Sequence, residues 1–285
     1  MITRRCTQRQ FLLRPDDELD NAFLYCLIEA ALRYDITLLH STAMANHHHT
    51  TIHDRIGTLC EFMEHFHKML AKCVNSMRGR WENCWASEPP CAVRLLERDD
   101  VINKVVYAAT NPVKDGLVEA ATDWPGVNTI DALLEGRELR ARRPAFFRDD
   151  GNMPAEVSIT LEIPPQLGDK DRFLDEVRER IAKVEARQLV IRSVLGRGVL
   201  GRTRIRQQSW RASPESHESR RVLRPRLAAQ SKWARIEALQ RSRSFQSEYQ
   251  LARRALLRGT PIPFPAGTYW LRRFMGVEVS PLILN

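Results

Sequence analysis

The sequence has no apolar run of the roughly 20 residues that a membrane-spanning helix needs, and its first residues show no signal-peptide pattern. Aromatic residues make up only 7% of the 285 residues, and the 13 glycines form no phosphate-binding loop of the Walker type. It also has no acidic cluster of the kind that holds two metal ions. These absences argue against a membrane protein, a P-loop ATPase and the commonest two-metal nucleases. We expect a cytoplasmic protein that uses no ATP.

The sequence contains six cysteines, but their spacing gives no sign of a disulfide framework or a standard metal site. All six cysteines lie in the first third of the chain, and none belongs to a CxxC motif. We expect reduced, mostly buried thiols. A zinc site made by Cys60, His65, His67 and Cys73 remains an alternative, although its spacing is that of no standard zinc finger.

The net charge of +9 is unevenly distributed along the chain. Residues 1–130 hold 14 Lys and Arg against 17 Asp and Glu, a net charge of −3. Residues 193–258 hold 16 basic residues against 4 acidic ones, and nearly all of the basic residues are Arg. The positive charge of the chain therefore lies in its C-terminal part, whereas residues 1–130 are net acidic.

Three consecutive histidines, His47, His48 and His49, follow a turn at Ala45-Asn46. The β-branched and apolar residues on both sides of the turn predict two paired strands. Alternate side chains of a strand share a face, so His47 and His49 point to one side and His48 to the other. Two neighbouring imidazoles can bind one divalent cation and leave its other positions open. The alternative is a surface histidine cluster without a metal.

A helix over residues 101–111 is the second informative segment. Its apolar residues recur at helical spacing, with Asp99 or Asp100 as the expected N-cap and Pro112 ending the helix at or before Asn111. Tyr107 lies one turn before Asn111, on a stripe separate from the apolar face. Such a tyrosine is either a packing residue with a solvated hydroxyl or, beside a metal-bound phosphate, a nucleophile.

Together these two motifs carry a resemblance. The run Asn46–His49, followed by Tyr107-Ala-Ala-Thr-Asn-Pro-Val and then by Asp123-Trp-Pro, resembles the single-tyrosine HUH transposases, in particular the REP-associated tyrosine transposases. The resemblance covers about residues 1–130. One position departs from the family pattern, because His48 stands where the family has a hydrophobic residue.

The resemblance implies DNA transposition by a single-strand endonuclease that acts on hairpin-forming, single-stranded DNA. His47, His49 and Asn111 would bind Mg²⁺ or Mn²⁺, and Tyr107 would form a 5′-phosphotyrosine intermediate, so that strand transfer needs no ATP. The resemblance also implies a homodimer associated with the bacterial nucleoid. Two rivals stay open: an HUH-fold regulator that binds DNA without turnover, and a plasmid replication or mobilisation nuclease.

The expected fold class is α+β, with a ferredoxin-like antiparallel sheet, helices on one face and a mainly helical, arginine-rich C-terminal extension. We expect a catalytic domain over residues 1–130, a linker with a short strand over 131–168 and a basic extension over 169–285. Periodicity predicts strands over 2–13, 36–44, 47–53 and 156–163, and helices over 16–34, 55–78, 101–111, 169–192 and 227–258.

Arginines of the extension are the candidate DNA-binding residues. Arginine binds phosphate bidentately, and interleaved aromatic residues such as Trp233 and Tyr249 can stack on unpaired bases. The alternative is a solvated helical face with a few packed aromatic residues. The candidates are Arg202, Arg204, Arg206, Arg220, Arg221, Arg224, Arg226, Arg235, Arg241 and Arg243.

Overall fold

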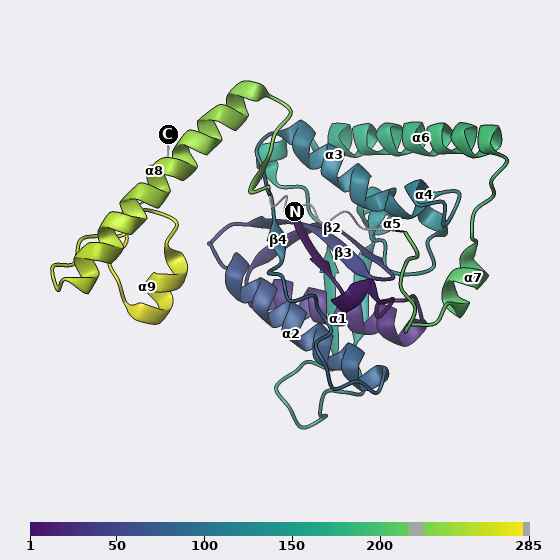
Figure 1. Cartoon of the computed structure of the whole chain (residues 1–285), viewed down its shortest axis with the longest axis horizontal. Coiled ribbons are helices and arrows are strands. Elements are labelled where there is room, and N and C mark those ends of the chain that lie inside the picture. Colours follow the sequence, from purple (N-terminus) through teal and green to yellow (C-terminus); the bar gives the residue numbers. More distant parts are fainter. Residues whose placement is uncertain (217–224, 282–285) are drawn as a thin grey trace.

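The computed structural model describes residues 1–216 and 225–281 of the chain (Figure 1). It is an α+β fold in which strands and helices are mixed along the sequence. In chain order the elements are β1 (Ile2–Arg5), η1 (Thr7–Arg9), α1 (Asp17–Arg33), β2 (Ile36–Met44), β3 (His47–Asp54), α2 (Leu59–Met77), β4 (Cys91–Ala92), β5 (Arg94–Leu95), α3 (Arg98–Ala109), α4 (Asn111–Lys114), η2 (Ala121–Asp123), α5 (Ile130–Glu135), β6 (Glu138–Arg142), β7 (Glu156–Thr160), η3 (Pro165–Leu167), α6 (Lys170–Leu195), α7 (Arg202–Gln207), β8 (Leu227–Ala228), α8 (Lys232–Leu257) and α9 (Tyr269–Met275).

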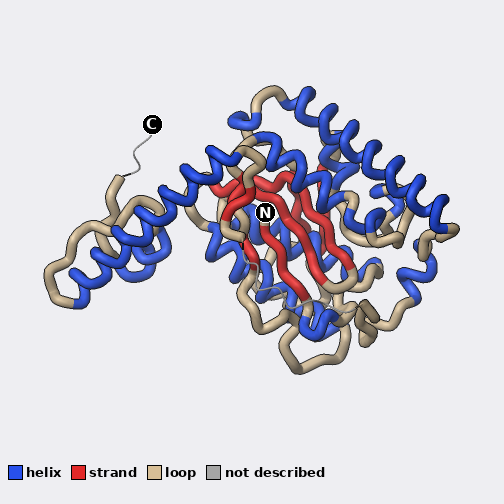
Figure 2. Tube along the Cα trace, turned by 45° about the horizontal axis from the view of Figure 1, so that its top comes forward, coloured by secondary structure: helices blue, strands red, loops and turns tan. Residues whose placement is uncertain are grey.

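The central feature is a four-stranded antiparallel sheet with the strand order β2-β3-β1-β4, seen at the centre of Figure 2. β2 and β3 form a hairpin whose two-residue turn is Ala45-Asn46, as the sequence predicts. β1 lies beside β3 and aligns Thr3 with His49 and Arg5 with His47. The first four strands and two long helices therefore follow the order β1-α1-β2-β3-α2-β4.

Acidic side chains start the two helices that flank the hairpin. The carboxylate of Asp16 accepts a hydrogen bond from the backbone N–H of Leu19 at 2.9 Å and caps α1. The carboxylate of Asp54 accepts from the N–H groups of Gly57, Thr58 and Leu59, and so satisfies donors that the first turn of α2 leaves free.

Helices cover both faces of the sheet, so the prediction of helices on one face is wrong. The rings of Phe23 from α1 and Phe66 from α2 contact His48 on one face. On the other face, α3 packs against β2 and β3, and the ring of its Tyr107 contacts that of His49. Most residues of β2 and several of β3 are buried on both sides of the sheet, including threonines and histidines.

The tyrosine helix α3 begins earlier than predicted. Its N-cap is Glu97, whose backbone N–H donates to the carboxylate of Asp100 at 3.1 Å, so neither Asp99 nor Asp100 is the cap. The helix ends at Ala109, before Pro112, as predicted, and the short helix α4 follows. Ile102 and Val105 on the predicted apolar face are completely buried.

Residues beyond 130 continue the same hydrophobic core. Within the segment expected to be a linker, α5 precedes an antiparallel β6–β7 hairpin, and this hairpin packs on α1. Phe173 and Val177 of α6 are fully buried, because α6 lies along α3. The basic extension expected from residue 169 thus begins with a helix that belongs to the core. The predicted strand over 156–163 is half of a hairpin, because residues 138–142, for which the sequence analysis predicted no strand, pair with it.

The last part of the chain separates into two regions at opposite ends of the sheet (Figure 1). α7 lies at the same end as α4, and the segment 200–216 hydrogen-bonds to the loop after α4 and to the loop before α1. α8 and α9 project from the opposite end. α9 is held there by Arg273, which pairs with Glu61 and donates to the carbonyl of Gly57 at 2.7 Å. In the part of the chain that the structure describes, no helix is long and apolar enough to cross a membrane.

Candidate active site

His47 and His49 lie side by side on the face of β3 that α3 covers. Their ring centroids are 4.9 Å apart, and the ring centroid of Tyr107 is 5.4 Å from that of His49. Asn111 at the start of α4 places its side-chain nitrogen 3.1 Å from Nε2 of His47. All four predicted site residues are therefore brought together, from two segments that lie about sixty residues apart in the sequence.

The Nδ1 atoms of both histidines are held by neighbouring side chains. Nδ1 of His47 lies 2.7 Å from Oδ1 of Asn46. Because an amide oxygen only accepts hydrogen bonds, Nδ1 of His47 is protonated and donates to it. Nδ1 of His49 lies 2.8 Å from Oγ1 of Thr3 on the neighbouring strand. Nε2 of His49 is buried and has no hydrogen-bond partner. Metal-binding histidines are oriented in this way, with one nitrogen hydrogen-bonded and the other presented to the ion.

Burial keeps both imidazoles neutral at physiological pH. It lowers the pKa of His47 to about 4, and the nearby charge of Arg5 adds to this effect. Burial, with the charge of His47 second, holds the pKa of His49 well below its usual range. A neutral imidazole keeps the lone pair that a metal requires.

These residues fit a divalent cation with nitrogen and oxygen ligands. The two imidazole rings lie side by side and the amide of Asn111 contacts His47. An amide turned by 180° presents its oxygen in place of its nitrogen. Within the described residues, no three His, Cys, Asp or Glu side chains meet in such a group. The ligand set would thus depend on an amide as its third member.

Tyr107 is accessible, with 40% of its surface exposed. Burial of the remainder, and then the negative charge of Asp115, raise the pKa of its hydroxyl above the usual value. The phenol is therefore protonated at neutral pH. The ammonium groups of Lys104 and Lys114 lie 5.5 and 4.7 Å from the centroid of its ring.

His48 points into the core, as the alternation predicts. It is completely buried, with Nε2 2.9 Å from Nε2 of His67 and Nδ1 3.0 Å from Oγ1 of Thr50. Burial lowers the pKa of both histidines, that of His67 to about 3. The departure from the family pattern therefore lies in the core, and its ring does not reach the opposite face where the candidate ligands converge.

The alternative zinc site does not form in the described structure. Cys60 is exposed, His65 hydrogen-bonds to Glu29 at 2.6 Å, and His67 pairs with His48. Cys73 is buried beside Cys26, whose thiol hydrogen-bonds to it. The four side chains therefore lie in different surroundings and do not come together as the ligands of one metal ion.

The candidate DNA-binding arginines do not form one surface. Arg202, Arg204 and Arg206 are exposed on α7, at the end of the sheet where α4 lies, and Arg206 pairs with Asp17 at 3.0 Å. The α8 candidates, Arg235, Arg241 and Arg243, are exposed on the projecting helix at the other end. Arg220, Arg221 and Arg224 lie outside the described residues.

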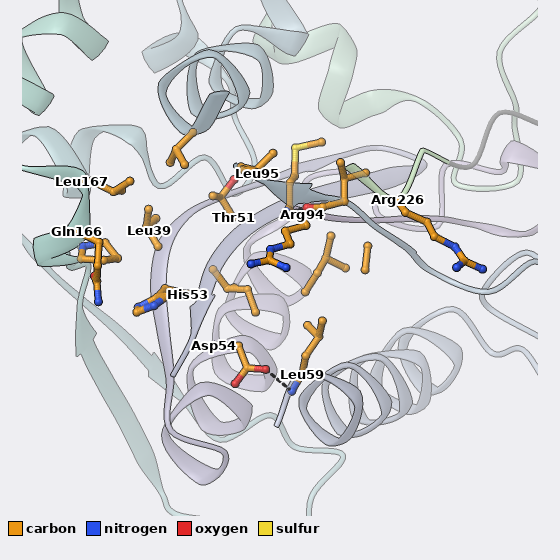
Figure 3. Close-up of a pocket in the computed structure, with 17 residues that line it drawn as sticks. Leu39, Thr51, His53, Asp54, Leu59, Arg94, Leu95, Gln166, Leu167 and Arg226 are labelled. Atoms are coloured by element: carbon orange, nitrogen blue, oxygen red, sulfur yellow. Dashed lines mark hydrogen bonds between the residues drawn. The ribbon is translucent and has the colours of Figure 1, made fainter. Parts of the chain in front are cut away.

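Two cavities lie at opposite ends of β3. One of about 630 Å³ adjoins the candidate site and is lined by His47, Phe11 and Trp124 among others. The other, of about 570 Å³, is shown in Figure 3, and its lining includes Thr51, His53, Arg94 and Arg226. This second cavity contains none of the residues predicted for metal binding or catalysis.

The sequence analysis missed four side chains at the site. Helical spacing could have indicated Lys104, which lies one turn before Tyr107, and Asn46 is adjacent to His47. Thr3 and Lys114 carry no such signal, because the register of β1 and the break after α3 bring them in. Comparisons of the chain with protein-family models, curated proteins and solved structures give no match.

Proposed function

We propose that this protein is a transposase-like, metal-dependent endonuclease and strand transferase for single-stranded, hairpin-forming DNA. The observation that carries the proposal is the convergence of His47, His49 and Asn111 beside an accessible Tyr107. A phosphate oxygen bound at the imidazole pair would lie next to a potential nucleophile.

The topology supports the same proposal. The element order β1-α1-β2-β3-α2-β4 and the strand order β2-β3-β1-β4 support a ferredoxin-like arrangement. The resemblance to the REP-associated tyrosine transposases implies this arrangement, with the histidine pair on an inner strand. β3 lies between β2 and β1, so its histidines occupy such a strand.

In the proposed reaction, Oη of Tyr107 forms a bond to phosphorus and the bond from phosphorus to the 3′ oxygen breaks. The phenol proton passes to solvent, the departing 3′ oxygen gains a proton, and the 5′ end stays attached to Tyr107. His47 and His49, with Asn111, would hold the divalent cation, which withdraws charge from the phosphate. The reverse attack by a 3′ hydroxyl rejoins a strand without ATP, because the covalent link conserves the phosphodiester bond energy.

One observation favours the second candidate, a regulator that binds DNA without turnover. The amide nitrogen of Asn111 lies 3.1 Å from Nε2 of His47, where it occupies the lone pair that a cation needs. Binding of a metal would require this amide to turn or move. If it does not, the same surface can hold a phosphate without cleaving it.

Tyr107→Phe tests the proposal, because it removes only the hydroxyl. The wild-type protein with Mn²⁺ should form a denaturation-resistant adduct with a 3′-labelled single-stranded oligonucleotide, because the fragment on the 3′ side of the cleaved linkage stays attached to Tyr107, and the variant should not. Tyr249→Phe on the distant helix α8 is the matched control. An adduct that persists in Tyr107→Phe contradicts the assignment of the nucleophile, and a wild-type protein that binds the oligonucleotide without any adduct favours the regulator.

The location of the arginines separates two modes of DNA binding. Because α7 lies at the same end as α4, replacing Arg202 and Arg204 with Gln should weaken binding of a short oligonucleotide at the cleavage site. Replacing Arg241 and Arg243 on α8 should affect only longer hairpins. Fluorescence anisotropy with both substrates measures the difference, and equal losses for the short oligonucleotide would contradict this division.

A further inference from the structure

Two lysines flank the ring of Tyr107 from different helices. Lys104 comes from α3, one turn before the tyrosine, and Lys114 comes from the end of α4, after the chain has changed direction at Thr110. Their ammonium nitrogens lie 5.5 and 4.7 Å from the ring centroid. The two positive charges are close enough that Lys104 contributes to lowering the pKa of Lys114, after burial as the main cause.

Neither ammonium group forms an ion pair with any residue that the structure describes. By contrast, Lys183 on α6 is paired with Glu179 at 2.5 Å. The charge of Asp115 acts on Lys114 at longer range and opposes the fall in its pKa. Contact with an aromatic face is a weak substitute for a counter-ion. Two neighbouring cations in a domain with an excess of acidic residues therefore indicate an anionic ligand.

Phosphate is the anion that the surroundings favour. The ring of His49 contacts the ring of Tyr107, so this imidazole and the two ammonium groups lie around the same phenol ring. An ammonium group binds a phosphate oxygen as a point charge and needs no fixed orientation.

We infer that Lys104 and Lys114 bind the non-bridging phosphate oxygens of the DNA backbone at the cleaved linkage. They thereby position the phosphodiester over Tyr107 independently of base sequence. The inference rests on the proposed function, because it names the substrate contact at that same site. It adds two residues that the resemblance does not assign.

Equilibrium binding tests the inference without any cleavage. In the full-length Tyr107→Phe protein with a chelator present, a fluorescent single-stranded oligonucleotide is titrated at several salt concentrations. The salt slope is the change in the logarithm of the binding constant with the logarithm of the salt concentration. Lys104→Met and Lys114→Met should each lower its magnitude by about 0.7. If a variant and the parent bind equally at 1 M salt, the variant should then bind about eightfold more weakly at 50 mM salt. Lys104→Arg and Lys114→Arg should retain the slope. Lys72→Met, an exposed lysine of α2, is the control.

A methylphosphonate identifies the phosphate concerned. Placed in turn at the cleaved linkage and at its two neighbours, it removes one charge from the substrate. At one of these positions the losses from Lys114→Met and from the methylphosphonate should not add. Folding of each variant is checked by its urea midpoint. Unchanged slopes in both lysine variants, or additive losses at all three positions, overturn the inference. A wild-type protein that forms no adduct although the lysine effects are present overturns the proposed function instead.

Discussion

Replacing His48 with the hydrophobic residue of the family pattern should destabilise this protein rather than improve it. His48→Leu removes two buried hydrogen bonds, to Thr50 and to His67, and leaves Nε2 of His67 without a partner. Each hydrogen bond contributes about 1 kcal/mol net, and an unsatisfied buried group costs about 1–3 kcal/mol. The added apolar surface of leucine offsets part of this. We expect the free energy of unfolding to fall by about 2–4 kcal/mol.

The double variant His48→Leu with His67→Leu should behave differently. It removes both imidazoles, so no buried ring nitrogen is left without its partner, and Thr50 keeps its hydrogen bond to Ser41 at 2.9 Å. The loss in the double variant should be smaller than the sum of the two single losses by about 2 kcal/mol.

Urea unfolding of the full chain, followed by tryptophan fluorescence and by circular dichroism, measures these differences. Losses that add within about 0.5 kcal/mol would refute the coupling of the two histidines. Binding of Mn²⁺ should be retained in His48→Leu, because this ring lies on the face of β3 opposite to the candidate ligands. A loss of metal binding without unfolding would refute the separation of the two faces.

Three further predictions concern other parts of the molecule. Thr3→Val removes the hydroxyl that lies 2.8 Å from Nδ1 of His49, so the candidate ligand loses the contact that orients its ring; Mn²⁺ binding should weaken about 10- to 100-fold in calorimetry, with no change in the urea midpoint beyond that of a surface substitution. Burial raises the pKa of Asp20 to about 8, above its unfolded value, so stability falls as pH rises from about 4 to about 8; Asp20→Asn should therefore unfold at higher urea than wild type at pH 8 but not at pH 4. Gly57→Ala should cost more stability than Gly79→Ala, because both have positive φ but only at Gly57 would a Cβ lie 2.1 Å from a ring atom of α9; equal thermal shifts would contradict the docking of that helix.

Local periodicity predicted the parts of the site that lie on one element. The period of two placed His47 and His49 on one face, and helical spacing together with Pro112 fixed the end of α3. The approach of Tyr107 to His49 came from the resemblance. The number of residues between the histidine strand and the tyrosine helix does not predict how close they lie in the folded protein.

The features that could not be predicted from the sequence depend on contacts between segments far apart in the chain. The register of β1 brings Thr3 to His49, and it depends on strands that are more than forty residues apart. Residues 138–142 form a strand because residues 156–160 pair with them, although three of these five residues are charged and periodicity predicted no strand there. The arginines after residue 193 looked like one basic region, but α7 and α8 carry them to opposite ends of the sheet.

The segment 200–216 has a consequence for the order of folding. It joins Arg9 to Ser216 and Arg14 to Gln208, contacts that span 207 and 194 positions of the chain. Closing loops of this length costs entropy before the contacts compensate for it, so such contacts form late. During synthesis the hairpin with its histidines and the tyrosine helix emerge from the ribosome long before this segment does. The wall of the cavity beside His47 that Gln208 and Ser216 supply is therefore added late, to a sheet and a tyrosine helix that already exist.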